Sequence, residues 1–365
     1  MVSEEMRLGA RNCILDWARV RETEQVLLLH VRGHVEPSVI ETFRLECERA
    51  GSFVSELICP VFNPRIEEPL EPVIQALQGA DVVFFFCPYP ALLHSKSGKK
   101  AMVEYGLRNV PVLTNTAELL GSEWARFPVP LQLELHRRSA EIVSRSPRIR
   151  VTAANGTEIE GLAPPVQRVN RSEVVHGLAW HGIWPGECGP CLTPMQEMNG
   201  RLVIDVLPGF QGFLQEKVVV DVHDNRIRSI HGGKEARWFS DLIESSMRAG
   251  CDDADVLHEL QWGVNPKGRI ERAVLQCEED EVEISRLART VHFGFGSGQK
   301  GFHWDTVIVD HFDIEVGDGT KIYEDGRLVL LDDPEIRALA SRFGDPDEVL
   351  REISQLDGRE DVAHG

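Results

Sequence analysis

The chain has 365 residues, of which 42% are apolar and 27% are charged, and its formal net charge is −19. This is the composition of a globular protein long enough for two domains with separate cores. The strong negative charge argues against nucleic acid and anionic membranes as partners. The N-terminus lacks an apolar signal core, and the longest apolar run, residues 82–87, is too short to span a bilayer. We therefore expect a cytoplasmic protein without a membrane partner.

Strand-like and helix-like segments alternate in the first half of the chain. After an amphipathic helix at residues 5–20, mainly apolar runs predict strands at residues 26–31, 53–59, 82–86 and 111–114. Segments with helical spacing separate these strands, at residues 37–50, 72–77 and 99–107. Such alternation predicts an open, mostly parallel α/β sheet with right-handed crossovers. We assign this N-terminal α/β domain to residues 1–147.

One histidine follows the third predicted strand, in the segment Ala91-Leu92-Leu93-His94-Ser95. Ligand-contacting groups of α/β sheets collect at the carboxyl ends of the strands. His94 can therefore be an acid/base or substrate-binding group, and an exposed loop histidine explains it equally well. The first strand is followed by neither G-x-G-x-x-G nor a P-loop, so no nucleotide site is predicted.

From residue 148 onward, short alternating runs are joined by turn signals. The dipeptide Asn155-Gly156 lies between two such runs and predicts a hairpin. Similar strand-and-turn units continue to residue 230, and one amphipathic helix is predicted at residues 234–249. We assign residues 148–365 to an antiparallel, β-rich (α+β) domain.

The segment Thr290–Asp310 has the residues of a metal site. His303 and Asp305 form an H-x-D pair, whose side chains lie on the same face of a strand. Several glycines, among them Gly294 and Gly296, are predicted to turn the chain so that His292 returns toward that pair. Two imidazoles and a carboxylate are suitable ligands for Zn, Fe, Mn or Co. A solvent-exposed hairpin is the alternative, because H-x-D alone is a weak signal.

Two glutamates upstream strengthen the metal hypothesis. Glu187 lies in a loop shaped by proline and glycine, and Glu259 stands among apolar residues, where an unpaired carboxylate is costly. Together with His292, His303 and Asp305 they suit a pair of divalent ions bridged by a carboxylate. A smaller subset suits non-haem Fe(II). The residue types leave both possibilities open.

The order of motifs resembles one superfamily over nearly the whole chain. The motifs are N-G-T-E-I at 155–159, N-G-R-L-V-I-D-V at 199–206, I-H-G-G-K-E-A at 230–236, W-G-V-N-P at 262–266 and H-W-D at 303–305. They are similar to those of the thermophilic metallo-aminopeptidases T and S and of the related 2,5-dihydroxypyridine 5,6-dioxygenases. The resemblance implies an N-terminal α/β domain, a C-terminal metal-binding catalytic domain, and a homo-oligomer, dimeric or larger.

The aminopeptidase branch implies a hydrolase that cleaves a C–N bond of a small molecule or short peptide, using one or two Zn, Mn or Co ions. Its metal ligands fall on five residues of the matching types: Glu187, Glu259, His292, His303 and Asp305. Glu187 is also the expected general base. The chain departs from this branch at Gln299, where the aminopeptidases have a tyrosine.

The dioxygenase branch implies the alternative, an Fe(II) enzyme that opens a hydroxylated N-heterocycle such as 2,5-dihydroxypyridine. His303 and Asp305 match two of its three iron ligands, and Glu259 stands where that branch has a second histidine. The segment Ala91–Ser95 is similar to its L-L-H-S motif, in which the histidine acts near the substrate, so this branch makes His94 the acid/base. A third possibility is a non-catalytic protein that binds metal structurally.

Overall fold

In the computed structural model, the structure describes residues 2–62, 68–87, 92, 95–164, 180–181, 183–185, 190–207, 213–268, 289–297, 302–309 and 311–353. The chain divides into two compact units, one of Met1–Leu133 with Val169–Glu187 and one of Glu134–Arg168 with Cys188–Gly365. The predicted α/β class with a parallel sheet and a separate antiparallel sheet is confirmed. The boundary at residues 147 and 148 stays a prediction. Among the described residues, the helices are too short or too polar to cross a membrane.

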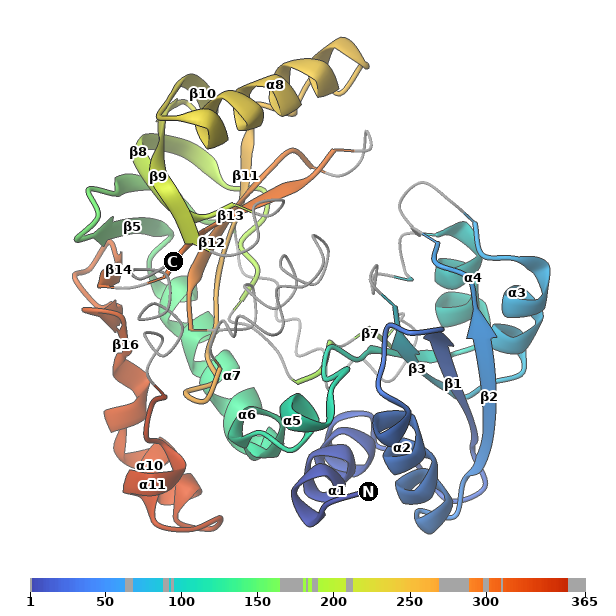
Figure 1. Ribbon diagram of the computed structural model, residues 1–365. Coiled ribbons are helices and arrows are strands. Elements are labelled where there is room, and N and C mark those ends of the chain that lie inside the picture. Colours follow the sequence, from blue (N-terminus) through green and yellow to red (C-terminus); the bar gives the residue numbers. More distant parts are fainter. Residues whose placement is uncertain are drawn as a thin grey trace. The chain divides into compact units, whose positions relative to one another are not determined.

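The first unit is built on a parallel sheet with the strand order β2-β1-β3-β4-β7. Its strands are β1 (Gln25–Val31), β2 (Phe53–Cys59), β3 (Val82–Phe86), β4 (Arg108–Pro111) and β7 (Trp180–His181). The helices are α1 (Glu4–Arg11), the π-helix η1 (Asn12–Trp17), α2 (Pro37–Arg49), α3 (Glu71–Gln78), α4 (Lys96–Glu104), α5 (Ala117–Leu120) and α6 (Glu123–Arg126). Figure 1 shows the strands side by side.

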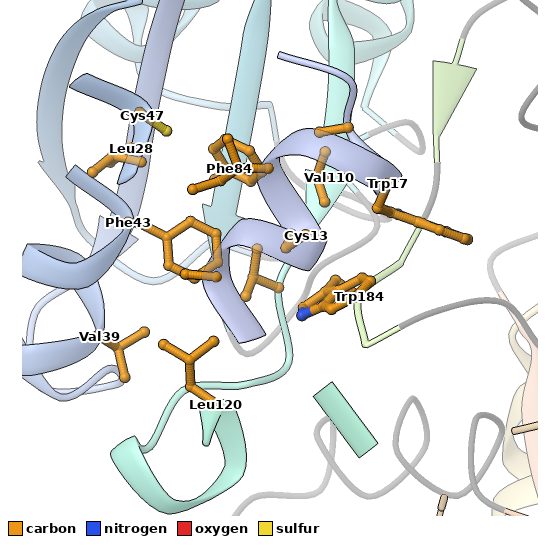
Figure 2. Packing of buried hydrophobic residues seen from close by; sticks show 14 of the residues in the cluster. Cys13, Trp17, Leu28, Val39, Phe43, Cys47, Phe84, Val110, Leu120 and Trp184 are labelled. Carbon is orange, nitrogen blue, oxygen red and sulfur yellow. The ribbon is translucent and has the colours of Figure 1, made fainter. Parts of the chain in front are cut away.

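Two apolar cores lie on opposite faces of this sheet. Along β1, Val26 and Leu28 belong to one core, whereas Leu27, Leu29 and Val31 belong to the other. Figure 2 shows the first core, in which a phenylalanine of α2 packs against β3. The second core lies beneath α3 and α4. Strands buried on both faces explain the continuous apolar runs of this half of the sequence.

The second unit is built on an eleven-stranded antiparallel sheet. The helix α7 (Val129–Arg145) leads into it from the first unit. The path β11-β12-β13-β8-β6-β5-β14-β15-β16 runs through the sheet, and β9 and β10 continue from β8. The strands are β5 (Arg148–Ala153), β6 (Glu158–Leu162), β8 (Gln196–Val206), β9 (Phe213–His223), β10 (Arg226–His231), β11 (Leu257–Trp262), β12 (Val291–Phe295), β13 (Trp304–Ile308), β14 (Phe312–Val316), β15 (Lys321–Glu324) and β16 (Arg327–Leu328).

Turn chemistry and one long helix shape this unit. The predicted hairpin at Asn155-Gly156 joins β5 and β6, and Gly156 has a φ of 104°, which favours glycine. The predicted helix is α8 (Lys234–Arg248), which packs on β9 and β10. The chain continues through η4 (Val329–Asp332), α10 (Pro334–Ala340) and α11 (Pro346–Val349).

Candidate metal centre

Three adjacent strands bring the predicted ligands to one face of the antiparallel sheet. Glu259 of β11 lies directly opposite Gly294 of β12, which in turn lies directly opposite Asp305 of β13. His292 is two residues before Gly294 and His303 two residues before Asp305, so the alternation of side chains puts all of them on the same face. A register shift between Leu257 and Glu259 marks a β-bulge. Bulges re-aim side chains, and this one sets the direction of Glu259.

The donor atoms of three residues converge at this face. One donor atom from each of Glu259, His303 and Asp305 lies within 4.8 Å of the other two. His303 Nε2 is 3.2 Å from Asp305 Oδ1. His292 Nε2 is 3.2 Å from Glu259 Oε1, so Glu259 lies near His292 as well as near the H-x-D pair. All five predicted ligands except Glu187 are therefore brought together.

The absence of a side chain at Gly294 lets the side chains of the cluster lie close over β12. A Cβ atom built there would be 2.6 Å from His303 Cε1, 3.1 Å from Glu259 Cβ and 3.2 Å from Asp305 Oδ1. A carbon atom does not fit at the first of these distances, so another residue at this position would push the cluster apart. The donor groups of the cluster are those that bind divalent metals. The imidazole and the two carboxylates that converge over Gly294 thus fit a metal ion. The same position corrects one prediction, because Gly294 lies inside β12 instead of forming a turn.

The side chains of the cluster are largely buried. The side chains of His292 and Asp305 are 0% and 1% exposed, and that of Glu259 is 9% exposed. Carboxylates buried to this extent are costly unless cations or hydrogen bonds compensate them. Burial, followed by the charge of the neighbouring His303, lowers the pKa of His258 in the bulge. His292 Nδ1 is buried with no hydrogen-bond partner among the described residues.

The tautomer of His303 follows from the hydrogen bond that its Nδ1 atom makes. Its Nδ1 atom lies 2.8 Å from the carbonyl oxygen of Gly296. A carbonyl only accepts, so Nδ1 donates, and in the neutral ring Nε2 carries the lone pair that faces Asp305. Histidines that bind metals typically donate their other N–H group in this way. The sequence predicted Gly296 only as part of a turn, and its carbonyl contact has no signature in the residue pattern.

Two predicted residues, Glu187 and His94, lie outside the described residues. Their proposed roles stay predictions. The second H-x-D pair, His311 and Asp313, is separate from the cluster: His311 pairs with Asp325, and Asp313 with Lys321.

These observations define the chain as a two-unit α/β protein whose antiparallel sheet has a candidate metal centre. The family model NicX, described as 2,5-dihydroxypyridine 5,6-dioxygenase, matches residues 10–333. The chain belongs to this family, and the superfamily resemblance seen in the sequence is confirmed. No curated protein gives a significant match.

Two solved structures have the same fold over most of the chain. The 2,5-dihydroxypyridine dioxygenase from Pseudomonas putida KT2440 is 18% identical, with a TM-score of 0.68 over 92% of this chain and 99% of that one. AmpT from Thermus thermophilus is 12% identical, with a TM-score of 0.57 over 89% of this chain and 99% of that one. At these identities the likeness establishes the fold.

Proposed function

We propose that the chain is a metal-dependent hydrolase that cleaves a C–N bond in a small molecule or short peptide. The observation that carries the proposal is the position of Glu259, which belongs to the cluster with His303 and Asp305 and whose Oε1 atom lies 3.2 Å from His292 Nε2. A carboxylate that is near a histidine outside the cluster as well as near the ligands within it is suited to be shared by two divalent ions, such as Zn, Mn or Co. His303 and Asp305 would complete one ion's ligand set, and His292 would contribute to the other's.

A bound divalent ion supplies a polarised carbonyl and a water whose pKa is lowered toward about 7. The chain's own groups do the rest. The Gly296 carbonyl holds the His303 ring so that its Nε2 atom faces the cluster. The strand register holds Glu259 and Asp305 on opposite sides of Gly294. Glu187 is proposed as the general base that accepts a proton from the attacking water and passes it to the leaving amine.

A second candidate is ring-cleaving dioxygenation with one Fe(II) held by Glu259, His303 and Asp305. The family model and the higher TM-score of the Pseudomonas structure favour it. In this candidate His292 is no ligand but a partner of Glu259, and His94 is the acid/base. Under either candidate we propose a cytoplasmic homo-oligomer, a dimer or larger, that acts on small molecules and does not bind nucleic acid or membranes.

Metal analysis of the anaerobically purified chain and of His292→Ala tests the two candidates. The hydrolase predicts about two ions of Zn, Mn or Co per chain, and about one in the variant. The dioxygenase predicts one Fe per chain in both proteins and oxygen uptake with a hydroxypyridine. His311→Ala is the matched control, because this exposed histidine also pairs with a carboxylate, Asp325. A chain that binds no divalent metal would refute both candidates.

Glu187→Gln gives an independent test that needs no metal count. Removing the general base should lower the hydrolytic kcat about 100-fold or more, since positioned bases contribute factors of about 100 to 10,000. Dioxygenation should be much less sensitive, because Glu187 has no role in it. An unchanged hydrolytic rate would contradict the role assigned to Glu187.

A further inference from the structure

The turn before β11 forms hydrogen bonds with Gly296 and Ser297, the corner that follows β12. Asp253 lies in this turn, and the Val256 N–H donates to its carbonyl oxygen at 2.9 Å. The same turn contacts two successive residues of the corner. The Gly296 N–H donates to the Val256 carbonyl at 2.8 Å, and both the N–H and the hydroxyl of Ser297 donate to Asp253 Oδ2.

The backbone of Gly296 is shaped for this contact. Its φ is 78°, in the left-handed region that favours glycine, and a Cβ atom there would be 2.5 Å from the Phe302 carbonyl oxygen. Its own carbonyl oxygen then lies 2.8 Å from His303 Nδ1. The orientation of the peptide between Gly296 and Ser297 therefore fixes which way the His303 ring faces.

We propose that Asp253 is a positioning residue for the metal site, acting on the ligand His303 through Ser297 and the Gly296 carbonyl. Asp253 fixes the Ser297 N–H, which belongs to the same peptide group as the Gly296 carbonyl. A fixed carbonyl keeps the proton on His303 Nδ1 and the lone pair on Nε2, the form that binds a metal. The inference rests on the proposed function only in taking His303 as a metal ligand.

The alternative role for Asp253 is ordinary loop closure. Loop closure predicts a loss of conformational stability on substitution, with the His303 tautomer and metal affinity unchanged. Positioning predicts that both the His303 tautomer and the metal affinity change. The two roles therefore differ in readouts that do not depend on turnover.

Zn²⁺ affinity of the full-length chain, measured by competition with a chromophoric chelator, gives the first readout. We expect Asp253→Ala to bind Zn²⁺ about 10- to 100-fold more weakly, the usual effect of losing a group that orients a metal ligand. Asp253→Asn keeps an acceptor oxygen for Ser297 and should bind within about threefold of the natural chain. Ser297→Ala keeps the backbone N–H bond and should lie between them.

Ser229→Ala is the matched control, since its hydroxyl donates to Asp221 Oδ2 at 2.7 Å in the β9–β10 hairpin. This variant loses the same kind of hydrogen bond at a position that is remote in the sequence from the proposed ligands. Its Zn²⁺ affinity should therefore not change.

The ¹⁵N shifts of the His303 ring in the zinc-free chain give the second readout. The natural chain should show a protonated Nδ1, and Asp253→Ala a mixture of tautomers. If Asp253→Ala does not fold, Ser297→Ala must show the smaller shift in the same direction. Natural tautomer and natural Zn²⁺ affinity in a folded variant would overturn the inference. His303→Ala separates this result from failure of the metal site itself: unchanged Zn²⁺ affinity in that variant would refute the metal site instead.

Discussion

The two faces of β11, β12 and β13 have opposite characters. One face has the cluster of Glu259, His303 and Asp305 around Gly294. On the other, Phe295 packs edge-on against Phe239 of α8 at 5.7 Å, and Trp304 against Trp238 at 5.6 Å. Because successive side chains alternate, each ligand strand is held by an apolar residue next to its ligand. The predicted ligands and the apolar residues that stabilise these strands thus alternate in the sequence and lie on opposite faces of the sheet.

Burying the polar side chains of the ligand face costs free energy of folding, and packing on the apolar face offsets this cost. Buried carboxylates and imidazoles destabilise a fold unless they are compensated. Burial of an aromatic side chain contributes about 2–3 kcal/mol, and an edge-on aromatic pair about 1 kcal/mol more. We therefore expect α8 to stabilise the strands by packing on their apolar face, without contacting the ligand atoms on the opposite face.

Phe239→Ala removes a buried aromatic side chain from the apolar face. Phe239 is fully buried, and truncation of such a side chain costs about 3–5 kcal/mol of unfolding free energy. Urea unfolding of the metal-free chain measures this loss, and Zn²⁺ affinity of the folded variant should change by less than about threefold. Phe343→Ala, at a phenylalanine that is 44% exposed, is the control and should cost little. A large loss of Zn²⁺ affinity in folded Phe239→Ala would mean that the two faces are not separable.

Gly294→Ala makes the opposite change, on the ligand face. The new methyl group forces His303 away, since its carbon would be 2.6 Å from the ring. We expect Zn²⁺ affinity to fall about 100-fold, equivalent to about 2.7 kcal/mol, with unfolding free energy nearly unchanged because a ring can move. The control is Gly79→Ala, where the nearest atom to a new Cβ is 3.9 Å away. Natural affinity in Gly294→Ala would show that metal binding does not need a residue without a side chain at this position.

Local patterns predicted most of the fold and part of the site. Alternation placed His303 and Asp305 on one face, and Asn155-Gly156 marked its hairpin. The role of Gly294 was mistaken, because sequence does not tell a glycine that opens a site from one that turns a chain. The bulge at His258 depends on the pairing of β11 with β12, which are far apart in the sequence. The contact of the Gly296 carbonyl with His303 depends on the backbone orientation at the corner after β12, which no local pattern records.

One predicted strand lies at other residues than expected. The fourth strand was expected at residues 111–114 and lies at Arg108–Pro111, where it pairs with β3. The Val112 N–H still donates to the Phe85 carbonyl oxygen at 2.9 Å, so hydrogen bonding to β3 extends one residue beyond Pro111. In addition, β7 joins the parallel sheet beside β4 although it begins 69 residues after β4 ends, and it pairs Trp180 with Arg108 and His181 with Asn109. The apolar runs gave no sign of this long-range pairing.

His34 in the first unit shows what burial does to a histidine outside the cluster. Burial lowers its pKa from 6.5 to about 4. Between these values the unfolded chain binds the extra proton, so its contribution to stability is complete above pH 6.5 and is lost as the pH falls toward 4. After discounting for partial exposure, we expect His34→Gln to recover about 1–2 kcal/mol at pH 4.5 relative to pH 7.5. Urea unfolding at both pH values measures this difference, and parallel pH profiles for the two proteins would contradict it.

The smallest predicted effect tests a polar group on the apolar face. The buried Thr306 hydroxyl donates to the Phe293 carbonyl at 3.1 Å, between β13 and β12. Thr306→Val keeps the shape and loses this hydrogen bond, so we expect a loss of about 1 kcal/mol in unfolding free energy. Thr152→Val is the control, at a half-buried strand position in β5. Because Thr306 is next to Asp305 but on the opposite face, Zn²⁺ affinity should stay within about twofold. A larger change would show that the strand transmits small shifts in its hydrogen bonding to the ligands.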